Sequence, residues 1–549
     1  MSLDAEPVGP IPEETSRVAR AAFPKGNVYI QMRDVLGVIY DDASFRPLFA
    51  VRGHPANHPW RLALVTVMQF AEGLSDRQAA EAVRARIDWK YALGLELTDA
   101  GFDFSVLSEF RTRLIGGSAE MLLLDALLTA CKARDYLKLR GRQRTDSTHV
   151  LGVLRVLNRL ELVAETLRAA LNAVATAAPA WLQALAAPEW FERYGRRIEE
   201  FRLPRGNEAR QEYAVLVGLD GMRLLAAIDE PTAPPEVRLL PAVEVLRRTW
   251  VQQYVTLDGR VHMREPKNMP PASMQVESPY ETEARYSTKR DQHWTGYKVH
   301  LSESCDDDRP HLLTHVETTA APATDVEQLA AVHQGLAERD LLPGQHLVDA
   351  GYVRGPNLVA SHTEHQIDLI GPIYEDHQWQ AKANNGFDVA HFQVDWDAEH
   401  VTCPQGKTSL RWCEMETARG RAMVHIDFAP ADCTPCPVRA LCTRAKTGAR
   451  SLTLQPRAEH EAIQVARQRQ QTTEFAAQYA SRAGIEGTLS QGVRAFGLRQ
   501  ARYRGLAKTH LQHVATAAAI NIVRLADWLN QAPRSTTRCS RFGALAPTG

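Results

Sequence analysis

Apolar residues recur at every third or fourth position in three short segments near the N-terminus, a spacing that predicts amphipathic helices. Pro59 lies in the first turn of one segment, and Gly73 ends it. Ser75 and Gln78 have the spacing of a capping box for the second helix, and Ser105 begins the third. Short helices joined by glycine-containing turns fit a helix-turn-helix that contacts DNA, and they equally fit an ordinary helical bundle.

Strand-like patterns appear in the middle of the chain. Gln143–Val150 is a first short strand, and Tyr297–Leu301 and His311–Val316 are spaced as a hairpin. Gln345–Tyr352 contains a short buried strand that ends in an acid and a glycine turn, and Ile367–Ile370 is a further short strand. Helical patterns separate these strands from the hairpin and from each other. This order of strands and helices predicts a mixed sheet in an α+β fold.

The same patterns divide the chain into segments. We expect residues 1–25, which are acidic and rich in proline, to be disordered, and 26–135 to form a helical domain. A core follows over 136–372, interrupted by a helical insertion at about 153–280. A polar, cysteine-rich insertion covers 373–460, helices return over 461–530, and the basic tail 531–549 is expected to be disordered.

Composition narrows the class of protein. The 549 residues carry a net charge of −1, with 44% hydrophobic and 23% charged residues, as in soluble globular proteins. No apolar run approaches the roughly 18 residues that cross a bilayer, and the N-terminus lacks the apolar centre of a secretory signal. We therefore expect a cytoplasmic protein whose eight cysteines are reduced. Motifs for ATP or NAD binding are absent from the sequence.

Charge is distributed unevenly near the C-terminus. Glu486 is followed by a stretch from Gly487 to Ala526 without any Asp or Glu. The stretch has six cationic residues: Arg494, Arg499, Arg502, Arg504, Lys508 and Arg524. One acid beside many cations suits a site that holds a divalent cation against a polyanion, whereas a solvated basic helix face is the simpler interpretation.

Two further acids follow strand-like runs. Asp146 lies within the first predicted strand, and Asp349 directly follows Gln345–Val348. With Glu486 they could meet at one edge of a sheet, where a few carboxylates hold Mg²⁺ and leave coordination positions for phosphate and water. Each acid taken alone could equally be a turn or capping residue.

The cysteines near residue 430 have metal-ligand spacing. Cys433 and Cys436 form a CxxC pair, followed by Cys442. Cys403, in a Cys-Pro-Gln-Gly turn, is the preferred fourth ligand over Cys413, and four thiolates would make a tetrahedral zinc site. Reduced cysteines without metal are the alternative.

Four motifs occur in an order that resembles a known family. They are Arg144-Thr-Asp146-Ser-Thr148, Trp294-Thr-Gly-Tyr-Lys298, Val348-Asp349-Ala-Gly-Tyr352 and Tyr479-x-x-Arg482-x-x-x-Glu486. Together they resemble the DDE transposases of bacterial insertion sequences in the IS4/IS5 supergroup, most closely the IS1182 type. The resemblance covers residues from about 45 to 529.

The resemblance implies an RNase H-like core in which Asp146, Asp349 and Glu486 bind two Mg²⁺ or Mn²⁺ ions. It implies double-stranded DNA as partner, both transposon ends and target, cleavage followed by strand transfer, and a homodimer at the bacterial nucleoid. A DNA-binding regulator without catalysis, or a nuclease that cuts without joining, remains an alternative function.

The same resemblance gives DNA-binding roles to residues around the third acid. The motif matches at Tyr479 and Arg482, but Val493 stands where the family has a lysine, and Arg494 follows one position later. Arg482 suits a phosphate clamp or, alternatively, an ion pair with Glu486 one turn away. Arg499, Arg502, Arg504 and Lys508 extend the basic stretch.

Trp294 and Lys298 form a further candidate contact with DNA. An aromatic ring among cationic residues can stack on a displaced base, whereas a tryptophan at the start of a strand is more commonly part of the core.

Overall fold

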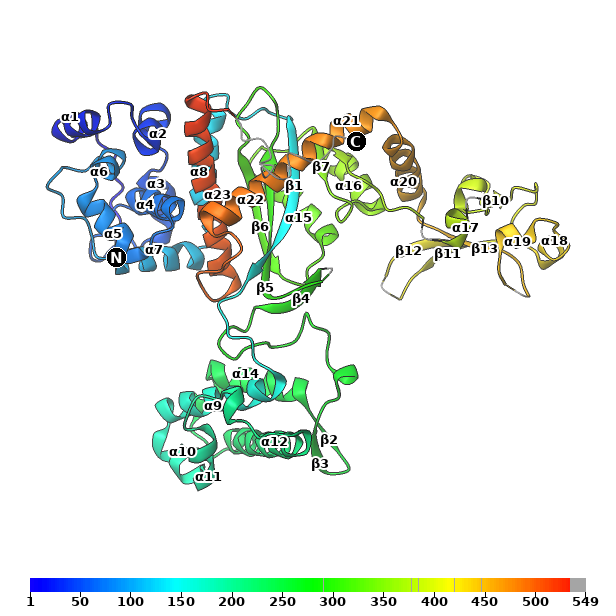
Figure 1. The fold of residues 1–549 in the computed structure, drawn as a ribbon, viewed down its shortest axis with the longest axis horizontal. Coiled ribbons are helices and arrows are strands. Elements are labelled where there is room, and N and C mark those ends of the chain that lie inside the picture. The colour runs from blue at the N-terminus through cyan, green and yellow to red at the C-terminus, as the bar shows by residue number, and fades with distance from the viewer. Residues whose placement is uncertain (290, 377, 384, 419, 446, 534–549) are drawn as a thin grey trace, which may run out of the picture. The chain divides into compact units, whose positions relative to one another are not determined.

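The computed structural model describes residues 1–289, 291–376, 378–383, 385–418, 420–445 and 447–533. The expected disordered tail 531–549 therefore lies mostly outside the described residues, as does Cys539. The chain divides into two compact units. The first comprises 1–138, 147–323 and 486–549, and the second comprises 139–146 and 324–485. Figure 1 shows the mixture of helices and sheet predicted from the sequence, an α+β fold.

The first unit begins with helices, including the three that the sequence predicted. Helix α4 ends at Gly73, which adopts the left-handed conformation that glycine favours, and the capping box of Ser75 and Gln78 at α5 is confirmed. Leu107, Phe110 and Leu114 of α7 are buried. The helices are α1 (Glu13–Ala22), α2 (Val28–Leu36), α3 (Asp42–Phe45), α4 (Pro59–Glu72), α5 (Asp76–Ala85), α6 (Ile87–Leu93), α7 (Ser105–Gly116) and α8 (Leu122–Lys132).

The structure differs from the disorder expected at residues 1–25. Helix α1 occupies Glu13–Ala22, with Thr15 and Ala19 buried. The Thr15 hydroxyl donates a hydrogen bond to the Leu95 carbonyl at 2.8 Å. The sequence did not predict this helix, because the segment is rich in proline and the helix has only one narrow apolar face.

The sheet of the first unit is antiparallel. Strands β4 (Arg285–Lys289), β5 (Gln292–Ser304) and β6 (Leu313–Ala320) pair in order, which confirms the predicted hairpin. The end of β1 (Arg142–Leu151) lies beside β5, where Gly152 N–H donates to the Thr295 carbonyl at 3.0 Å. A side chain on Gly296 would meet the Val150 carbonyl, so only glycine permits this approach. Helix α23 (Leu506–Leu529) packs on β6.

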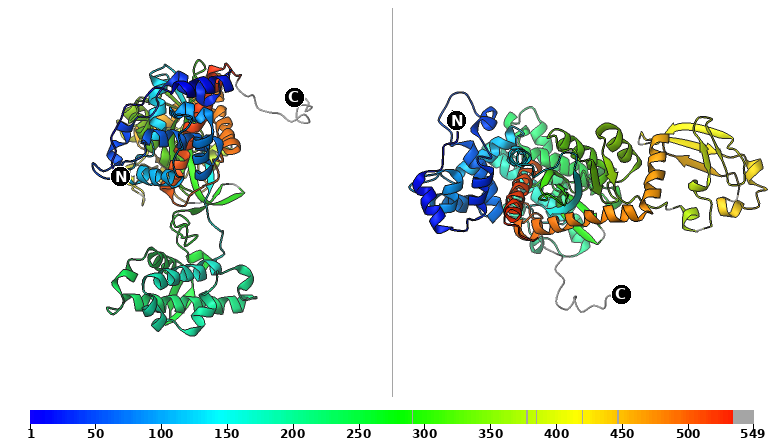
Figure 2. Two further views of the ribbon diagram at one scale, coloured as in Figure 1. Left: turned by 90° about the vertical axis from the view of Figure 1, so that its left-hand side faces the viewer. Right: turned by 90° about the horizontal axis from the view of Figure 1, so that it is seen from above.

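A helical bundle lies between β1 and β4, as the sequence predicted for residues 153–280. Helices α10, α11, α13 and α14 each begin with a proline in the first turn, where proline needs no backbone N–H partner. Figure 2 shows these helices gathered into a bundle. Buried apolar residues from them form one core. The elements are α9 (Arg159–Ala177), α10 (Pro179–Leu185), α11 (Pro188–Tyr194), α12 (Asn207–Asp229), α13 (Pro235–Arg238), α14 (Pro241–Gln253), β2 (Tyr254–Leu257) and β3 (Arg260–Met263).

The second unit contains a parallel sheet. The start of β1 pairs with β7 (Gln345–Val348), and β7 pairs with β8 (Asp368–Ile370), all in parallel. Thr324 begins α15 with a capping box that includes Glu327. The helical stretch predicted from residue 461 is divided, because Thr472 caps a new helix. The helices are α15 (Asp325–Ala337), α16 (Gly355–His365), α20 (Arg457–Gln470) and α21 (Thr473–Ala480), then the 3₁₀ turn η5 (Ser481–Ala483) and the start of α22 (Gly484–Phe496).

The cysteine-rich insertion of this unit is a small module of short strands. Its apolar core has only seven buried residues, among them Val401 and Ile426. Its elements are α17 (Trp379–Lys382), β9 (Gln393–Asp395), β10 (His400–Thr402), β11 (Arg411–Glu416), β12 (Ala422–Asp427), α18 (Pro430–Cys433), α19 (Arg439–Cys442) and β13 (Ser451–Leu454). Within the described residues, no helix is long and apolar enough to cross a membrane.

Candidate active site

Asp146 and Asp349 occupy equivalent places on two neighbouring strands. In the parallel pairing of β1 with β7, Thr145 lies opposite Val348; Asp146 is the next residue of β1, and Asp349 is the first residue after β7. Asp146 is 8% exposed and Asp349 is half-buried. The Gly351 N–H donates a hydrogen bond to Asp349 Oδ1 at 2.8 Å, which fixes the carboxylate at the turn after β7. The structure therefore brings these two acids to one edge of the parallel sheet.

A third carboxylate lies close to Asp349, and the sequence analysis missed it. A Cβ atom placed on Gly351 would be 2.9 Å from Asp349 Oδ1 and 3.3 Å from Asp325 Oδ2. Asp325 is the first residue of α15, directly after the Thr324 cap. Asp325 was not recognised as a site residue, because an acid in the first turn of a helix is ordinarily explained by its favourable interaction with the helix dipole.

Arg482 pairs with Asp146. Its Nη2 donates to Asp146 Oδ2 at 2.6 Å, and both side chains are almost nine-tenths buried. Next to this pair, the Arg144 guanidinium donates to the Ser481 carbonyl. These contacts hold η5 against β1. Neither sequence interpretation of Arg482 named this partner, because a contact over 336 positions leaves no local pattern.

Glu486 lies in the first turn of α22, where its side chain is exposed, and it begins the last of the three segments that make up the first unit. The same helix is anchored two residues later. Thr488 donates to Glu303 Oε2 at 2.6 Å, and Arg524 donates to the same oxygen at 2.7 Å. In the described part of the chain, no three His, Cys, Asp or Glu side chains are placed to hold one metal ion.

Most of the predicted basic residues are exposed, and some of them also contact other side chains. Arg494, Arg502, Arg504 and Lys508 are exposed, and Arg504 lies over the Tyr280 ring. Arg499 is half-buried and donates from Nε to Thr148 Oγ1 at 2.8 Å. Arg502 lies over the Phe70 ring and donates to the Leu74 carbonyl at 3.2 Å.

Trp294 is part of the core, as the second of its two sequence interpretations has it, and is not exposed as a base-stacking residue would be. Its side chain is 6% exposed, and its Nε1–H donates to the Tyr297 carbonyl at 3.1 Å. The ring lies 5.5 Å from that of His149, whose pKa is lowered by burial and by the nearby cations Arg499 and Lys289.

Two other predicted DNA contacts also have partners within the protein. Lys298 donates from Nζ to the Ala323 carbonyl at 2.6 Å. Tyr479 is half-buried and stacks on Phe475, with ring centroids 5.5 Å apart.

The cysteines predicted as metal ligands lie around one cavity. Cys403, Cys433, Cys436 and Cys442 all line a space of about 260 Å³ in the small module. Burial raises the pKa of the Cys442 thiol. Cys413 does not line this cavity; it lies on β11 opposite His425.

Comparison with known protein families gives two matches along the chain. Residues 17–113 match a transposase domain (DUF772), and residues 402–526 match a transposase DDE domain. The second match begins one residue before Cys403 and includes the four cavity-lining cysteines and Glu486, whereas Asp146 and Asp349 precede it. No match was found among curated proteins.

Proposed function

This chain belongs to the DDE transposases of insertion sequences, with matches that fit the IS1182 type, and we propose that it cuts DNA at the element ends and joins them to target DNA. The observation that carries the proposal is the pairing of β1 with β7, which sets Asp146 and Asp349 at adjacent strand positions. Transposases act on DNA, so the first partner is double-stranded DNA.

The two aspartates fit the hard cations that such enzymes use. Both offer carboxylate oxygens at one sheet edge, and Mg²⁺ is held in proteins by one or two carboxylates plus phosphate and water. In the proposal Asp146, Asp349 and Glu486 hold two Mg²⁺ or Mn²⁺ ions. Bound there, the ions would neutralise charge on the phosphate and lower the pKa of an attacking water.

Along the sequence, Glu486 is near a residue that contacts Asp146. Arg482 is fixed on Asp146 by its ion pair, and Glu486 follows four residues later. This anchoring supports an RNase H-like arrangement, in which two acids come from strands and the third from a helix.

The chemistry would proceed in two displacements. In the first, water forms a bond to phosphorus at the element end and the bond to the 3′ oxygen breaks, which leaves a 3′-OH and a 5′-phosphate. In the second, that 3′-OH attacks a target phosphodiester and releases a target 3′-OH. The exposed cations Arg494, Arg504 and Lys508 would bind the DNA backbone, as Lys and Arg generally bind phosphates.

The remaining segments receive supporting roles in the same proposal. The helical domain over 26–135 binds DNA ends and forms a homodimer, so that two ends are held together. Its match to a transposase domain supports this role. DNA transposition places the protein at the bacterial nucleoid.

One assay with a labelled element end and a supercoiled target plasmid tests the function. Strand transfer in Mg²⁺ supports the transposase, cleavage without joining identifies a nuclease, and binding without reaction identifies a regulator. Asp349→Asn should abolish cleavage yet keep DNA-end binding within about threefold. Glu364→Gln, an exposed acid of α16 in the same unit, is the matched control and should cleave normally. Normal cleavage by Asp349→Asn would refute the site assignment.

A further inference from the structure

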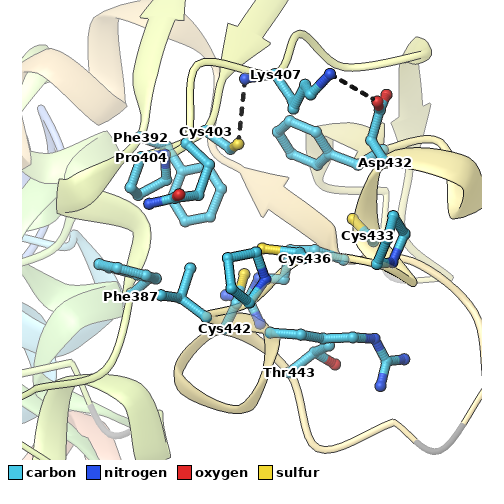
Figure 3. A pocket seen from close by; sticks show the side chains of 17 residues that line it. Phe387, Phe392, Cys403, Pro404, Lys407, Asp432, Cys433, Cys436, Cys442 and Thr443 are labelled. Carbon is cyan, nitrogen blue, oxygen red and sulfur yellow. Dashed lines mark hydrogen bonds and ion pairs between the residues drawn. The ribbon is translucent and has the colours of Figure 1, made fainter.

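Four thiol groups converge from separate parts of the small module. Cys403 follows β10, Cys433 ends α18, Cys436 lies in the turn after it, and Cys442 ends α19. Figure 3 shows their sulfur atoms around the same cavity. Free cysteines in a structural role are usually dispersed as small apolar side chains, so four around one space is an arrangement that needs an explanation.

The turn that carries Cys403 is built like a metal-binding knuckle. The Gly406 N–H donates to the Cys403 carbonyl at 2.8 Å, and the Cys403 N–H donates to the Lys407 carbonyl at 2.8 Å. The Lys407 N–H then points back to Cys403 Sγ at 3.4 Å. A backbone N–H directed at sulfur stabilises a thiolate and orients it as a ligand.

We propose that Cys403, Cys433, Cys436 and Cys442 bind one structural zinc ion. Four thiolates complete the tetrahedral coordination of a closed zinc site, with no position left open for catalysis. The structure assigns Cys403 rather than Cys413, whose Sγ lies 3.6 Å from the Glu414 carbonyl on β11. This site is separate from the carboxylates of the proposed active site, and the inference does not depend on DNA chemistry.

The module has a physical need for such an ion. Seven buried apolar residues form its core, and Cys403, Cys433 and Cys442 are among the partly buried side chains packed against them. A core of this size leaves little hydrophobic stabilisation, and small domains commonly add a metal for that reason. The described thiols are not yet at ligand distances, so zinc binding would draw α18 and α19 together as the module closes.

An ion pair is part of the lining of the cavity. Lys407 Nζ lies 3.3 Å from Asp432 Oδ1. Lys407 is four residues after Cys403, and Asp432 directly precedes Cys433. The bridge ties the two ligand-bearing segments to each other without metal.

Metal analysis of the full-length protein tests the proposal. The wild type should contain about one zinc per chain. The double variant Cys433→Ser/Cys436→Ser should contain less than a fifth of that, and Cys413→Ser, the matched control, should retain it all. Limited proteolysis provides a second readout: chelation or the double variant should make 373–456 at least tenfold more susceptible, with the rest of the chain unchanged. Cobalt added to metal-free protein should give thiolate-to-metal absorption that the double variant lacks.

Two results would overturn the inference. One is a metal-free wild type whose module resists protease equally with and without added zinc. The other is loss of zinc by Cys413→Ser to the same extent as by the double variant.

Discussion

Arg482 and Asp146 form an ion pair at 2.6 Å, although 336 positions separate them in the chain. The guanidinium thereby occupies one oxygen of a carboxylate that the proposed chemistry assigns to a metal ion. In the protein without metal, Arg482 supplies the positive charge beside Asp146. Asp146 and Arg482 should accordingly respond together to substitution and to added metal.

Arg482→Ala should destabilise the protein by about 3 kcal/mol, because it leaves a largely buried carboxylate without its partner. Mg²⁺ should raise the melting temperature of this variant more than that of the wild type, since the cation replaces the lost charge. Thermal unfolding with and without Mg²⁺ measures both effects. Arg494→Ala, which removes an exposed arginine, is the control and should melt like the wild type.

Glu303→Leu should lower the free energy of unfolding by about 3 to 4 kcal/mol, because the largely buried Arg524 guanidinium loses its ion-pair partner. Glu303 is fully buried and accepts from both Arg524 and Thr488. The double variant Glu303→Leu/Arg524→Met should regain at least half of the stability that Glu303→Leu alone loses, since neither charge then remains. Urea unfolding of the four proteins in the cycle checks this. Additive losses would contradict the coupling.

Stability should fall in acid because of buried histidines. Burial lowers the pKa of His333 to about 4 and of His513 to about 3. The unfolded chain binds protons near pH 6.5, so stability is complete above that pH and declines as the pH falls toward 4. At pH 5, each histidine should lower the free energy of unfolding by up to about 2 kcal/mol relative to neutral pH.

Unfolding midpoints at pH 7.5 and pH 5.0 measure this loss. His333→Gln should flatten the dependence, whereas His362→Gln, an exposed histidine of α16, should leave it unchanged. Equal slopes for wild type and His333→Gln would exclude His333 as a source of the acid sensitivity.

Two glycines should respond oppositely to alanine. In α12, a Cβ on Gly221 would lie 2.1 Å from the Trp250 ring, so Gly221→Ala should destabilise the bundle by about 2 kcal/mol. In α22, Gly487 has open space around it, and Gly487→Ala should stabilise the helix by about 0.5 to 1 kcal/mol. Differential scanning calorimetry distinguishes the two signs. Stabilisation by Gly221→Ala would disprove the close contact with Trp250.

Local motifs made part of this fold predictable. The capping boxes at Ser75 and Thr324 depend on residues three apart, and both are present. The strands that carry Asp146 and precede Asp349 were recognisable from short apolar runs. The length of α12 was not, because exposed Leu216 and Leu219 beside buried residues blur the helical period.

Contacts between residues far apart in the chain could not be predicted from the sequence. Nothing near Arg482 or Trp294 indicates that one binds Asp146 and the other packs against His149. From neighbours in the chain alone, Arg482 could bind phosphate or an acid, and Trp294 could stack on a base or lie in the core. Tertiary burial decides their roles instead, as it decides that Arg502 rests on Phe70.

The bundle between β1 and β4 leaves and re-enters the sheet at nearly the same place. A Cβ on Gly152 would be 3.4 Å from the Ala284 Cβ atom, so the entry and the exit of the bundle are neighbours. Residues 153–283 could therefore be deleted as a unit. A linker of a few glycines from Gly152 to Ala284 should preserve the strands on either side.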